Sequence, residues 1–326
     1  MMKNKEITLF YQWIEESDNI IIGSHLNPDG DNLGSLTALY HYLLKLDKNV
    51  TWYGEDSVPD DLQFLPNIKM RTTKCKEDYD LFIALDCADI NRLGEGRKIF
   101  KRSNKTINID HHKTNTNFAD LNIVKDISST GELLYQILDQ GSLSLDTEIA
   151  TGLFTAISSD TGSFKYDSTK AGTFFAAGHL MEYNIPINKI SVNLYQKRSL
   201  AKTSLLIEAM KDVEYLNNHE IAIVMVPLDL IDKCHGKQSD TEGIVEFIRD
   251  IEPVEIAILL KERRDEVKVS IRTKSYANAI SIVIPFGGGG HVRAAGATIS
   301  GNLLEVKEKI KEVALKELEN ARNTGC

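Results

Sequence analysis

Cysteine is scarce in this sequence: its 326 residues include four, Cys75, Cys87, Cys234 and Cys326, and no two of them form a Cys-x-x-Cys pair. This scarcity argues against a disulfide-built scaffold and against a thiolate zinc site. Long hydrophobic runs are also missing, because no apolar stretch approaches the ~20 residues that span a bilayer. The first residues, Met-Met-Lys-Asn-Lys-Glu, lead into an amphipathic segment and not into the apolar core of a signal peptide. We therefore expect a cytoplasmic protein with no membrane partner.

Positive charge is in deficit, since 38 lysines and arginines face 47 aspartates and glutamates, a formal net charge of −9. That balance argues against binding to long duplex nucleic acid, which depends on neutralising phosphates. A small phosphorylated ligand is still compatible with it, because local charge matters more there. Between residues 255 and 300 the balance reverses, which indicates a specific anion near the basic positions Lys261, Arg263, Arg264, Lys268, Arg272, Lys274 and Arg293.

The chain is long enough for two domains, and its hydrophobic fraction of 42% is typical of a globular protein. Three apolar runs in its first half, residues 20–22, 81–85 and 106–109, predict buried strands. Apolar residues at helical spacing over 33–45 predict a helix after the first of them. Because the carboxyl ends of parallel strands meet at one edge, residues that follow these runs are expected to lie together.

Acids and histidines follow each of these runs. Together with the end of a later helix, the chain offers His25, Asp29, Asp31, Asp86, Asp110, His111, His112 and Asp160. Carboxylates and imidazoles are the ligands of hard divalent cations that act on phosphate. Carboxylates crowded together would repel one another unless cations lay among them. The pattern therefore predicts a metal site.

Each feature taken alone has a simpler interpretation. An Asp-Gly-Asp loop such as 29–31 is most often a turn, and Asp86 after a strand can be a helix cap. A His-His pair is usually a surface or core feature, and Asp160 before Thr-Gly is usually a cap or turn residue. Their conjunction favours two cations about 3.5–4 Å apart, bridged by a carboxylate and a water, which is the usual solution for phosphoester hydrolysis.

From residue 220 the pattern restarts. Strands are expected over 221–226, 254–260 and 267–272, the last two paired through a turn, and helices over 242–250, 277–284 and 303–318. Four consecutive glycines, 287–290, precede His291. This run is compatible with a flexible hairpin or with a loop whose backbone N–H groups bind an anion, and the basic surroundings favour the loop.

Taken together, these residues resemble the DHH phosphoesterases that carry a carboxy-terminal DHHA1 domain, over nearly the whole length. The matching motifs are His25-Leu-Asn-Pro-Asp29-Gly-Asp31, Leu85-Asp86, Asp110-His111-His112, Ser159-Asp160-Thr161-Gly162 and Gly287-Gly-Gly-Gly290-His291-Val-Arg-Ala-Ala-Gly296. One departure is Asn32-Leu33, where relatives usually carry a small residue after the second aspartate. It is not expected to touch the metal ligands.

The resemblance implies two divalent metal ions, most commonly Mn²⁺, with Mg²⁺ or Co²⁺ as substitutes. It assigns one ion to His25, Asp29 and Asp86. It assigns the other to Asp31, Asp86, His111 and Asp160, so that Asp86 bridges the two. Asp110 would orient a histidine, and His112 would contact the reacting phosphate. The family's substrate-binding positions correspond to Arg272, Gly288, Gly289, Gly290 and His291.

The resemblance also implies an α/β architecture in two domains. Residues 1–185 would form the catalytic DHH domain around a doubly wound, mostly parallel sheet, residues 186–215 a helical linker, and residues 216–326 a smaller α/β DHHA1 domain, with the active site in the cleft between the domains. A homodimer is implied by the resemblance only.

Within the family, the chain is similar to bifunctional oligoribonucleases that also dephosphorylate pAp (3′-phosphoadenosine 5′-phosphate). The substrates implied are short single-stranded RNA (nanoRNA) and pAp, cleaved by a two-metal hydroxide mechanism. The alternatives are a cyclic-dinucleotide or linear-dinucleotide (pApA or pGpG) signalling phosphodiesterase, a single-strand DNA exonuclease, and a non-catalytic nucleotide sensor.

Overall fold

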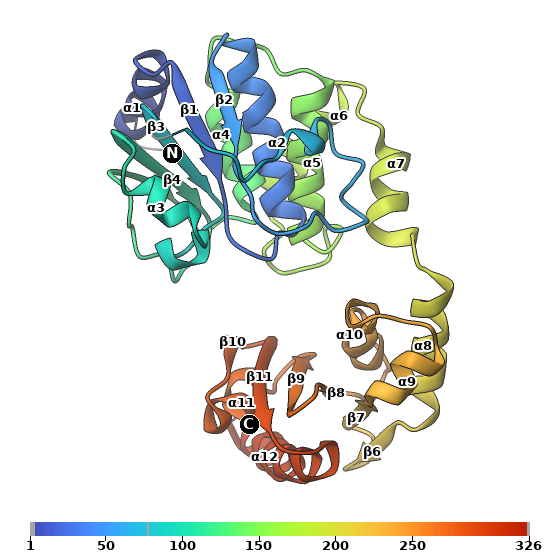
Figure 1. Cartoon of the computed structure of the whole chain (residues 1–326). Helices are drawn as coiled ribbons and strands as arrows, with labels where there is room; N and C mark the ends of the chain where they lie inside the picture. The colour runs from blue at the N-terminus through green and yellow to red at the C-terminus, as the bar shows by residue number, and fades with distance from the viewer. Residues whose placement is uncertain (1–3, 77, 325–326) are drawn as a thin grey trace. The chain divides into compact units, whose positions relative to one another are not determined.

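The structure is a computed structural model that describes residues 4–76 and 78–324 (Figure 1). Residues 1–3 of the expected leading segment and Cys326 lie outside the described residues. The chain divides into two compact units, residues 1–197 and 198–326. Among the described residues, no helix combines the length and the apolar character that crossing a bilayer would take.

The first unit is built on a parallel sheet whose described strands run in the order β2-β1-β3-β4-β5. Their bounds are β1 (Asn19–Gly23), β2 (Asn49–Trp52), β3 (Leu81–Leu85), β4 (Lys105–Asp110) and β5 (Leu121–Val124). The three apolar runs are confirmed as β1, β3 and β4, which are direct neighbours in the sheet. Because every pair is parallel, the carboxyl ends of these strands lie at one edge.

Helices cover both faces of this sheet (Figure 1). Their bounds are α1 (Asn4–Glu15), α2 (Gly30–Lys45), α3 (Gly96–Phe100), α4 (Thr130–Leu138), α5 (Thr147–Asp160), α6 (Ala171–Met181) and α7 (Ile187–Ser191), with short 3₁₀-helices η1 (Ile68–Met70) and η2 (Ile90–Leu93) and a π-helix η3 (Val192–Gln196). Side chains of one face, including Ile20 and Ile22, pack with α2, α4 and α5 in one core. Side chains of the other face, including Ile21 and Phe82, pack against α3.

Helix α2 begins at Gly30, three residues before the start that apolar spacing predicts. The reason is a cap: Asp29 has an extended backbone, and its side chain accepts a hydrogen bond from the N–H of Asn32. Capping by an aspartate satisfies an N–H group that the helix itself cannot pair. The cap places Asp31 in the first turn of α2, at the edge of the sheet.

The second unit holds a mixed sheet whose described strands run in the order β10-β11-β9-β8-β7-β6. The strands are β6 (Glu214–Leu216), β7 (Ile221–Val226), β8 (Ile256–Glu262), β9 (Glu266–Thr273), β10 (Gly289–His291) and β11 (Ala294–Ser300). The helices and turns are α8 (Leu200–Lys211), α9 (Leu228–Lys233), η4 (Gln238–Thr241), α10 (Ile244–Arg249), α11 (Ala279–Val283), η5 (Ile284–Phe286) and α12 (Leu303–Thr324). The expected pair over 254–260 and 267–272 is confirmed as the antiparallel pair β8 and β9. The α/β architecture expected from the sequence is therefore present in both units.

Candidate metal centre

The expected ligand residues lie at the carboxyl edge of the first sheet, on separate elements. His25 follows β1, Asp86 follows β3, and His111 follows β4. Asp31 is in the first turn of α2, and Asp160 is the last residue of α5. The sheet and two helices thus bring together side chains that are far apart in the sequence.

One group of these side chains surrounds His25. Its Nε2 atom lies 3.2 Å from Asp86 Oδ2 and 3.8 Å from Asp29 Oδ2. The three residues each offer one ligand atom, and these atoms all lie within 4.8 Å of one another, so the group could hold a metal ion. Asp86 has a φ of 52°, a left-handed conformation that is uncommon outside glycine and that clusters at functional sites.

A second group surrounds His111. Its Nε2 atom lies 3.5 Å from Asp160 Oδ2 and 3.8 Å from Asp31 Oδ2, and these three residues could also hold a metal ion. The same nitrogen is 3.7 Å from Asp86 Oδ1. Asp86 therefore faces the first group with one carboxylate oxygen and the second group with the other.

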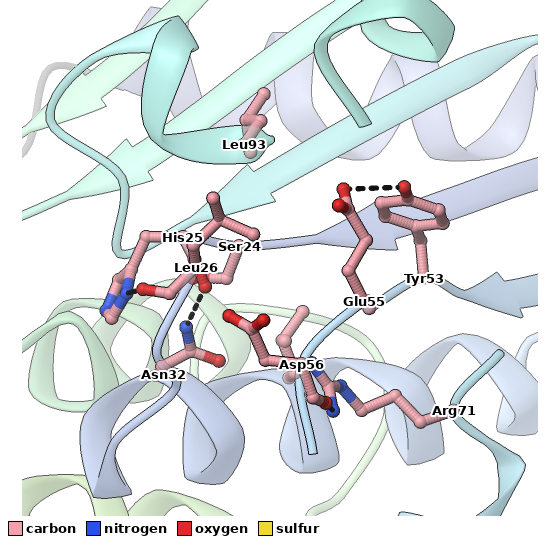
Figure 2. Close-up of a pocket in the computed structure, with 11 residues that line it drawn as sticks. Ser24, His25, Leu26, Asn32, Tyr53, Glu55, Asp56, Arg71 and Leu93 are labelled. Carbon is pink, nitrogen blue, oxygen red and sulfur yellow. Dashed lines mark hydrogen bonds between the residues drawn. The ribbon is translucent and has the colours of Figure 1, made fainter. Parts of the chain in front are cut away.

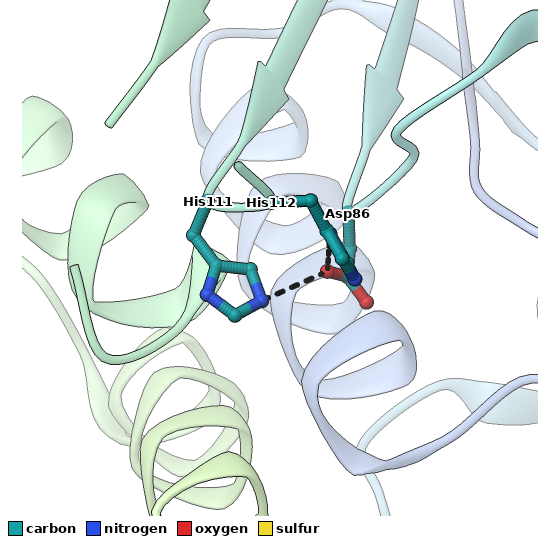
Figure 3. Close-up of side chains that lie close together, drawn as sticks. All are labelled: Asp86, His111 and His112. Atoms are coloured by element: carbon teal, nitrogen blue, oxygen red, sulfur yellow. Dashed lines mark ion pairs between the residues drawn. The ribbon is translucent and has the colours of Figure 1, made fainter. Parts of the chain in front are cut away.

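His112 approaches Asp86 from the same end of β4 as His111 (Figure 3). Asp86, His111 and His112 form a third set of possible metal ligands. However, the Nδ1 of His112 donates a hydrogen bond of 2.7 Å to Asp110 Oδ1, whereas its distance to Asp86 Oδ1 is 3.7 Å. Asp110 is fully buried. With Nδ1 engaged by Asp110, the other ring nitrogen of His112 remains for an external ligand.

Asp31 is held by the start of α4, a contact that the sequence did not indicate. Its two carboxylate oxygens accept hydrogen bonds from the N–H groups of Thr130, at 2.7 Å, and Gly131, at 2.8 Å. Ser35 Oγ donates to the same carboxylate at 3.2 Å, and Thr130 Oγ1 donates to Asp86 Oδ1 at 3.1 Å. The Ser-Thr-Gly-Glu sequence at the start of this helix predicts a helix N-terminus, but it does not predict which carboxylate the N–H groups there will bind.

The loop that carries His25 is held by a hydrogen bond from the side chain of Asn32. The Asn32 Nδ2 donates to the carbonyl oxygen of His25 at 3.1 Å, and Asn32 is buried. The expectation that Asn32 would not touch the expected ligand residues is therefore wrong, because its side chain donates to the backbone of His25, one of those residues. Gly30 leaves no room for a side chain, because a Cβ atom there would collide with Ser159.

A small pocket lies against the same loop (Figure 2). It is lined by Ser24, His25, Leu26, Asn32, Leu36, Tyr53, Gly54, Glu55, Asp56, Arg71 and Leu93. Polar contacts in its wall support the loop: Asp56 Oδ2 accepts the N–H of Asn27 at 2.6 Å, and Arg71 Nη1 donates to the carbonyl of Asp56 at 2.5 Å. The segment 53–56 thus acts as a support for the His25 loop.

The charges of the site fit divalent cations. Burial and the neighbouring charges of Asp86 and Asp160 raise the pKa of Asp31 well above its usual range. Burial, with the charge of Asp86, also raises the pKa of Asp160, to about 6. Burial acts to raise the pKa of Asp86 too, but the hydrogen bond and charge of His25 outweigh it and bring that pKa to about 2. A cation among these carboxylates would relieve their repulsion, and oxygen and imidazole donors suit Mn²⁺ and similar ions.

In the second unit, Arg272 lies on β9 and is held by an acid of the same unit. Its Nε and Nη2 atoms both lie 3.0 Å from Glu246 Oε1 on α10. Arg293 donates instead to the backbone carbonyls of Ala277 and Ser275, so its guanidinium braces a turn.

Gly289 and Gly290, the second half of the glycine run before His291, lie in a β-strand. Gly289 to His291 form β10, which pairs antiparallel with β11 at the edge of the sheet and is exposed. The glycine run therefore forms part of a hairpin with β11, and anion binding by its backbone N–H groups stays a prediction. Gly288 is required by close packing, because a Cβ atom there would lie 2.6 Å from the carbonyl oxygen of Gly296.

Comparison with known families matches both units. Residues 19–157 match the model of the DHH family, N-terminal domain, and residues 229–320 match the DHHA1 domain. The chain is 31% identical over 315 residues to a bifunctional oligoribonuclease and PAP phosphatase, NrnA, of Thermus thermophilus, covering 93% of this chain and 91% of that protein. It is 26% identical over 287 residues to the protein of the same name from Bacillus subtilis, covering 86% and 90%.

Solved structures agree with the fold. An exopolyphosphatase-related protein from Bacteroides fragilis superposes with a TM-score of 0.92 at 25% identity, covering 98% of both chains. RecJ of Thermus thermophilus in complex with Mn²⁺ superposes with a TM-score of 0.57 at 14% identity, over 96% of this chain and 54% of that one. The second likeness concerns the fold alone.

Proposed function

This chain belongs to the DHH family, and we propose that it is a metal-dependent phosphoesterase that hydrolyses short oligoribonucleotides to mononucleotides and dephosphorylates pAp to AMP. The observation that carries the proposal is Asp86, whose two oxygens face two separate groups of possible metal ligands. The proposed substrate class is supported by relatives named as bifunctional oligoribonuclease and PAP phosphatase, one of them 31% identical over most of both chains.

We propose that two divalent cations bind, most favourably Mn²⁺, with Mg²⁺ or Co²⁺ as substitutes. His25, Asp29 and Asp86 would hold one, and Asp31, Asp86, His111 and Asp160 would hold the other. When bound, such cations supply positive charge to the phosphoryl oxygens and lower the pKa of water.

The chain's own residues prepare the site in three ways. Backbone N–H groups of α4 orient Asp31, and Thr130 orients Asp86, so that the carboxylates do not have to rearrange on binding. The hydrogen bond to Asp110 raises the pKa of His112, which favours the protonated ring. The free Nε2–H of that ring would donate to a phosphoryl oxygen and stabilise the charge that grows there during hydrolysis.

Residues of the second unit would select the substrate. We propose that Arg272, Gly288, Gly289, Gly290 and His291 bind a terminal phosphate or the distal nucleotide. Arginine suits this role because its planar guanidinium can donate two parallel hydrogen bonds to a phosphate. Exposed backbone beside glycine allows close approach of an anion.

The test is product analysis with Mn²⁺ on RNAs of two to ten nucleotides, labelled at the 5′ end or the 3′ end, with pAp, pApA, pGpG, cyclic di-AMP and single-stranded DNA of matched length alongside. Release of mononucleotides from the short RNAs and of phosphate from pAp is the expected result. Faster turnover of a cyclic or linear dinucleotide would make the protein a signalling phosphodiesterase, and preference for DNA would make it an exonuclease. Release of nothing from any of these substrates would overturn the proposal in favour of a nucleotide sensor.

A further inference from the structure

Asn115 lies three residues after the Asp110-His111-His112 tripeptide and contacts the carboxylate of Asp110. The Nδ2 of Asn115 donates to Asp110 Oδ2 at 2.6 Å. The other oxygen, Oδ1, accepts the Nδ1–H of His112 at 2.7 Å. One carboxylate therefore joins an amide on one side to an imidazole on the other, and Asp110 is fully buried, so water does not compete for either contact.

The amide of Asn115 is itself fixed in one orientation. Its Nδ2 also lies 2.7 Å from Asn108 Oδ1 and 3.2 Å from the carbonyl oxygen of Cys87. Its Oδ1 accepts the N–H of Asn117 at 2.7 Å. Because a carboxylate only accepts and a backbone N–H only donates, the two ends of this amide cannot be exchanged. Asn115 is thus a rigid donor toward Asp110.

We propose that Asn115 is a positioning residue for the phosphoesterase reaction: it fixes the carboxylate plane of Asp110, which in turn fixes the imidazole of His112. This inference rests on the proposed function, in which His112 contacts the reacting phosphate. The torsion that turns a carboxylate plane has broad minima, so a single hydrogen bond from His112 would leave that plane free to rock. A second donor on the opposite oxygen removes this freedom.

A purely local role for Asn115 would be to close the turn after β4. The backbone already closes it, since the N–H of Asn115 donates to the carbonyl of His112 at 3.1 Å. The side chain therefore does more than close the turn: beside its local contact with the N–H of Asn117, it reaches the carboxylate of Asp110. Asn122 provides the contrast: among residues 4–76 and 78–324, its amide pairs only with the backbone of Ala119, with its Nδ2 donating at 2.6 Å and its Oδ1 accepting at 3.1 Å.

Asn115→Asp tests the proposal, because it keeps the shape and replaces the donor with a second negative charge facing Asp110. The expected result is a fall in kcat of about tenfold to a hundredfold on short RNA, the range found when the outer hydrogen-bond partners of residues at a metal site are lost. KM and the Mn²⁺ affinity measured by calorimetry should change little, because the metal ligands are untouched. Asn122→Asp is the matched control and should keep the wild-type kcat.

Nuclear magnetic resonance of the metal-free protein gives an independent readout. The signal of the His112 Nδ1–H proton is assigned by its loss in His112→Gln. This proton should be protected from exchange with water in the wild type and in Asn122→Asp. The resonance of this proton should shift or vanish in Asn115→Asp. An unchanged proton signal overturns the proposal, and so does a loss of Mn²⁺ affinity in step with kcat, which would make Asn115 a structural residue. If the wild type hydrolyses no nucleotide, the proposed function fails. The signal of the His112 Nδ1–H proton then still decides whether Asn115 fixes the Asp110–His112 pair.

Discussion

Gly34 in α2 and Gly152 in α5 face each other so closely that a Cβ atom on either would lie 2.6 Å from the carbonyl oxygen of the other. The two helices can approach to this distance only because neither residue carries a side chain. Both helices deliver metal-ligand candidates, Asp31 at the start of α2 and Asp160 at the end of α5. The glycine pair therefore sets how far apart these two carboxylates lie around His111.

Gly152→Ala should destabilise the protein by about 1–3 kcal/mol, the range for forcing extra volume into a packed core. Denaturant unfolding of the metal-free protein measures this, and the midpoint should fall. Mn²⁺ affinity should fall as well, because α5 and Asp160 would be pushed away from α2. The matched control is Gly178→Ala in α6, where nothing lies within 4 Å of the added Cβ atom. That variant should gain up to about 1 kcal/mol from helix propensity, and an unchanged midpoint for Gly152→Ala would contradict the packing argument.

Asp86→Asn should abolish hydrolysis in the presence of Mn²⁺ and remove measurable Mn²⁺ binding, because Asp86 is shared by both groups of possible metal ligands. Asparagine tolerates the positive φ of this position, so the circular dichroism spectrum should stay that of the wild type. Activity assays and calorimetry check the two halves of this expectation.

The control for Asp86→Asn is Asp80→Asn, at the opposite end of the same strand. Asp80 accepts hydrogen bonds from the N–H groups of Asp18 and Asn19, away from the ligand edge. Its replacement should leave Mn²⁺ binding intact. Full activity in Asp86→Asn would contradict the proposal that this residue is shared by two cations.

The parts of the site that the sequence predicted are those with a strong local pattern. β1, β3 and β4 are short apolar runs, and His25, Asp86 and Asp110 come at or just after their ends, so strand periodicity and the edge rule of parallel sheets bring them together. The start of α2 lies three residues before the predicted one, because the spacing of apolar residues carries no information about the polar residue that caps a helix.

The parts that were missed depend on contacts between distant residues. Thr130 pairs with Asp31 across 99 positions of the sequence, and no local pattern marks that partnership. β11 consists largely of small residues that favour strands only weakly, and its pairing with residues 266–272 of β9 makes it a strand. Asn115 was missed because a turn after a strand is a common place for asparagine.

Arg272→Ala should raise KM for short RNA by about tenfold to a hundredfold, because a hydrogen bond to a charged group contributes about 1.5–3 kcal/mol. Arg272→Lys should recover little of this, since an ammonium cannot reproduce the planar pair of donors. Steady-state kinetics with Mn²⁺ in excess separates KM from kcat. Arg263→Ala is the control: this exposed arginine pairs with Glu266 next to the β8–β9 turn, and such pairs contribute little. Equal KM values for the two alanine variants would remove Arg272 from the substrate site.

Stability of the metal-free protein should fall as pH rises from about 5 to about 7.5. The Asp160 carboxyl has its pKa raised to about 6 by burial and by the charge of Asp86, so the folded chain holds a proton there that the unfolded chain has released. Stability from such a group is complete below the unfolded pKa of about 3.9 and is lost as pH rises through the folded value. The raised pKa values of Asp31, His25 and His112 act in the same direction. The low pKa of Asp86, about 2, makes no difference in this window.

Divalent cations should reverse this loss, because they bind the carboxylates only after the protons have left. Melting temperatures measured with a chelator and with Mn²⁺ at about pH 5 and about pH 7.5 give the comparison, and the gain from Mn²⁺ should be clearly larger at the higher pH. Asp160→Asn removes the titrating carboxyl, so its metal-free melting temperature should fall less over the same interval, and its gain from Mn²⁺ should shrink. An equal gain from Mn²⁺ at both pH values would mean that protons and cations do not compete at this edge of the sheet, and the assignment of Asp160 as a ligand would fall with it.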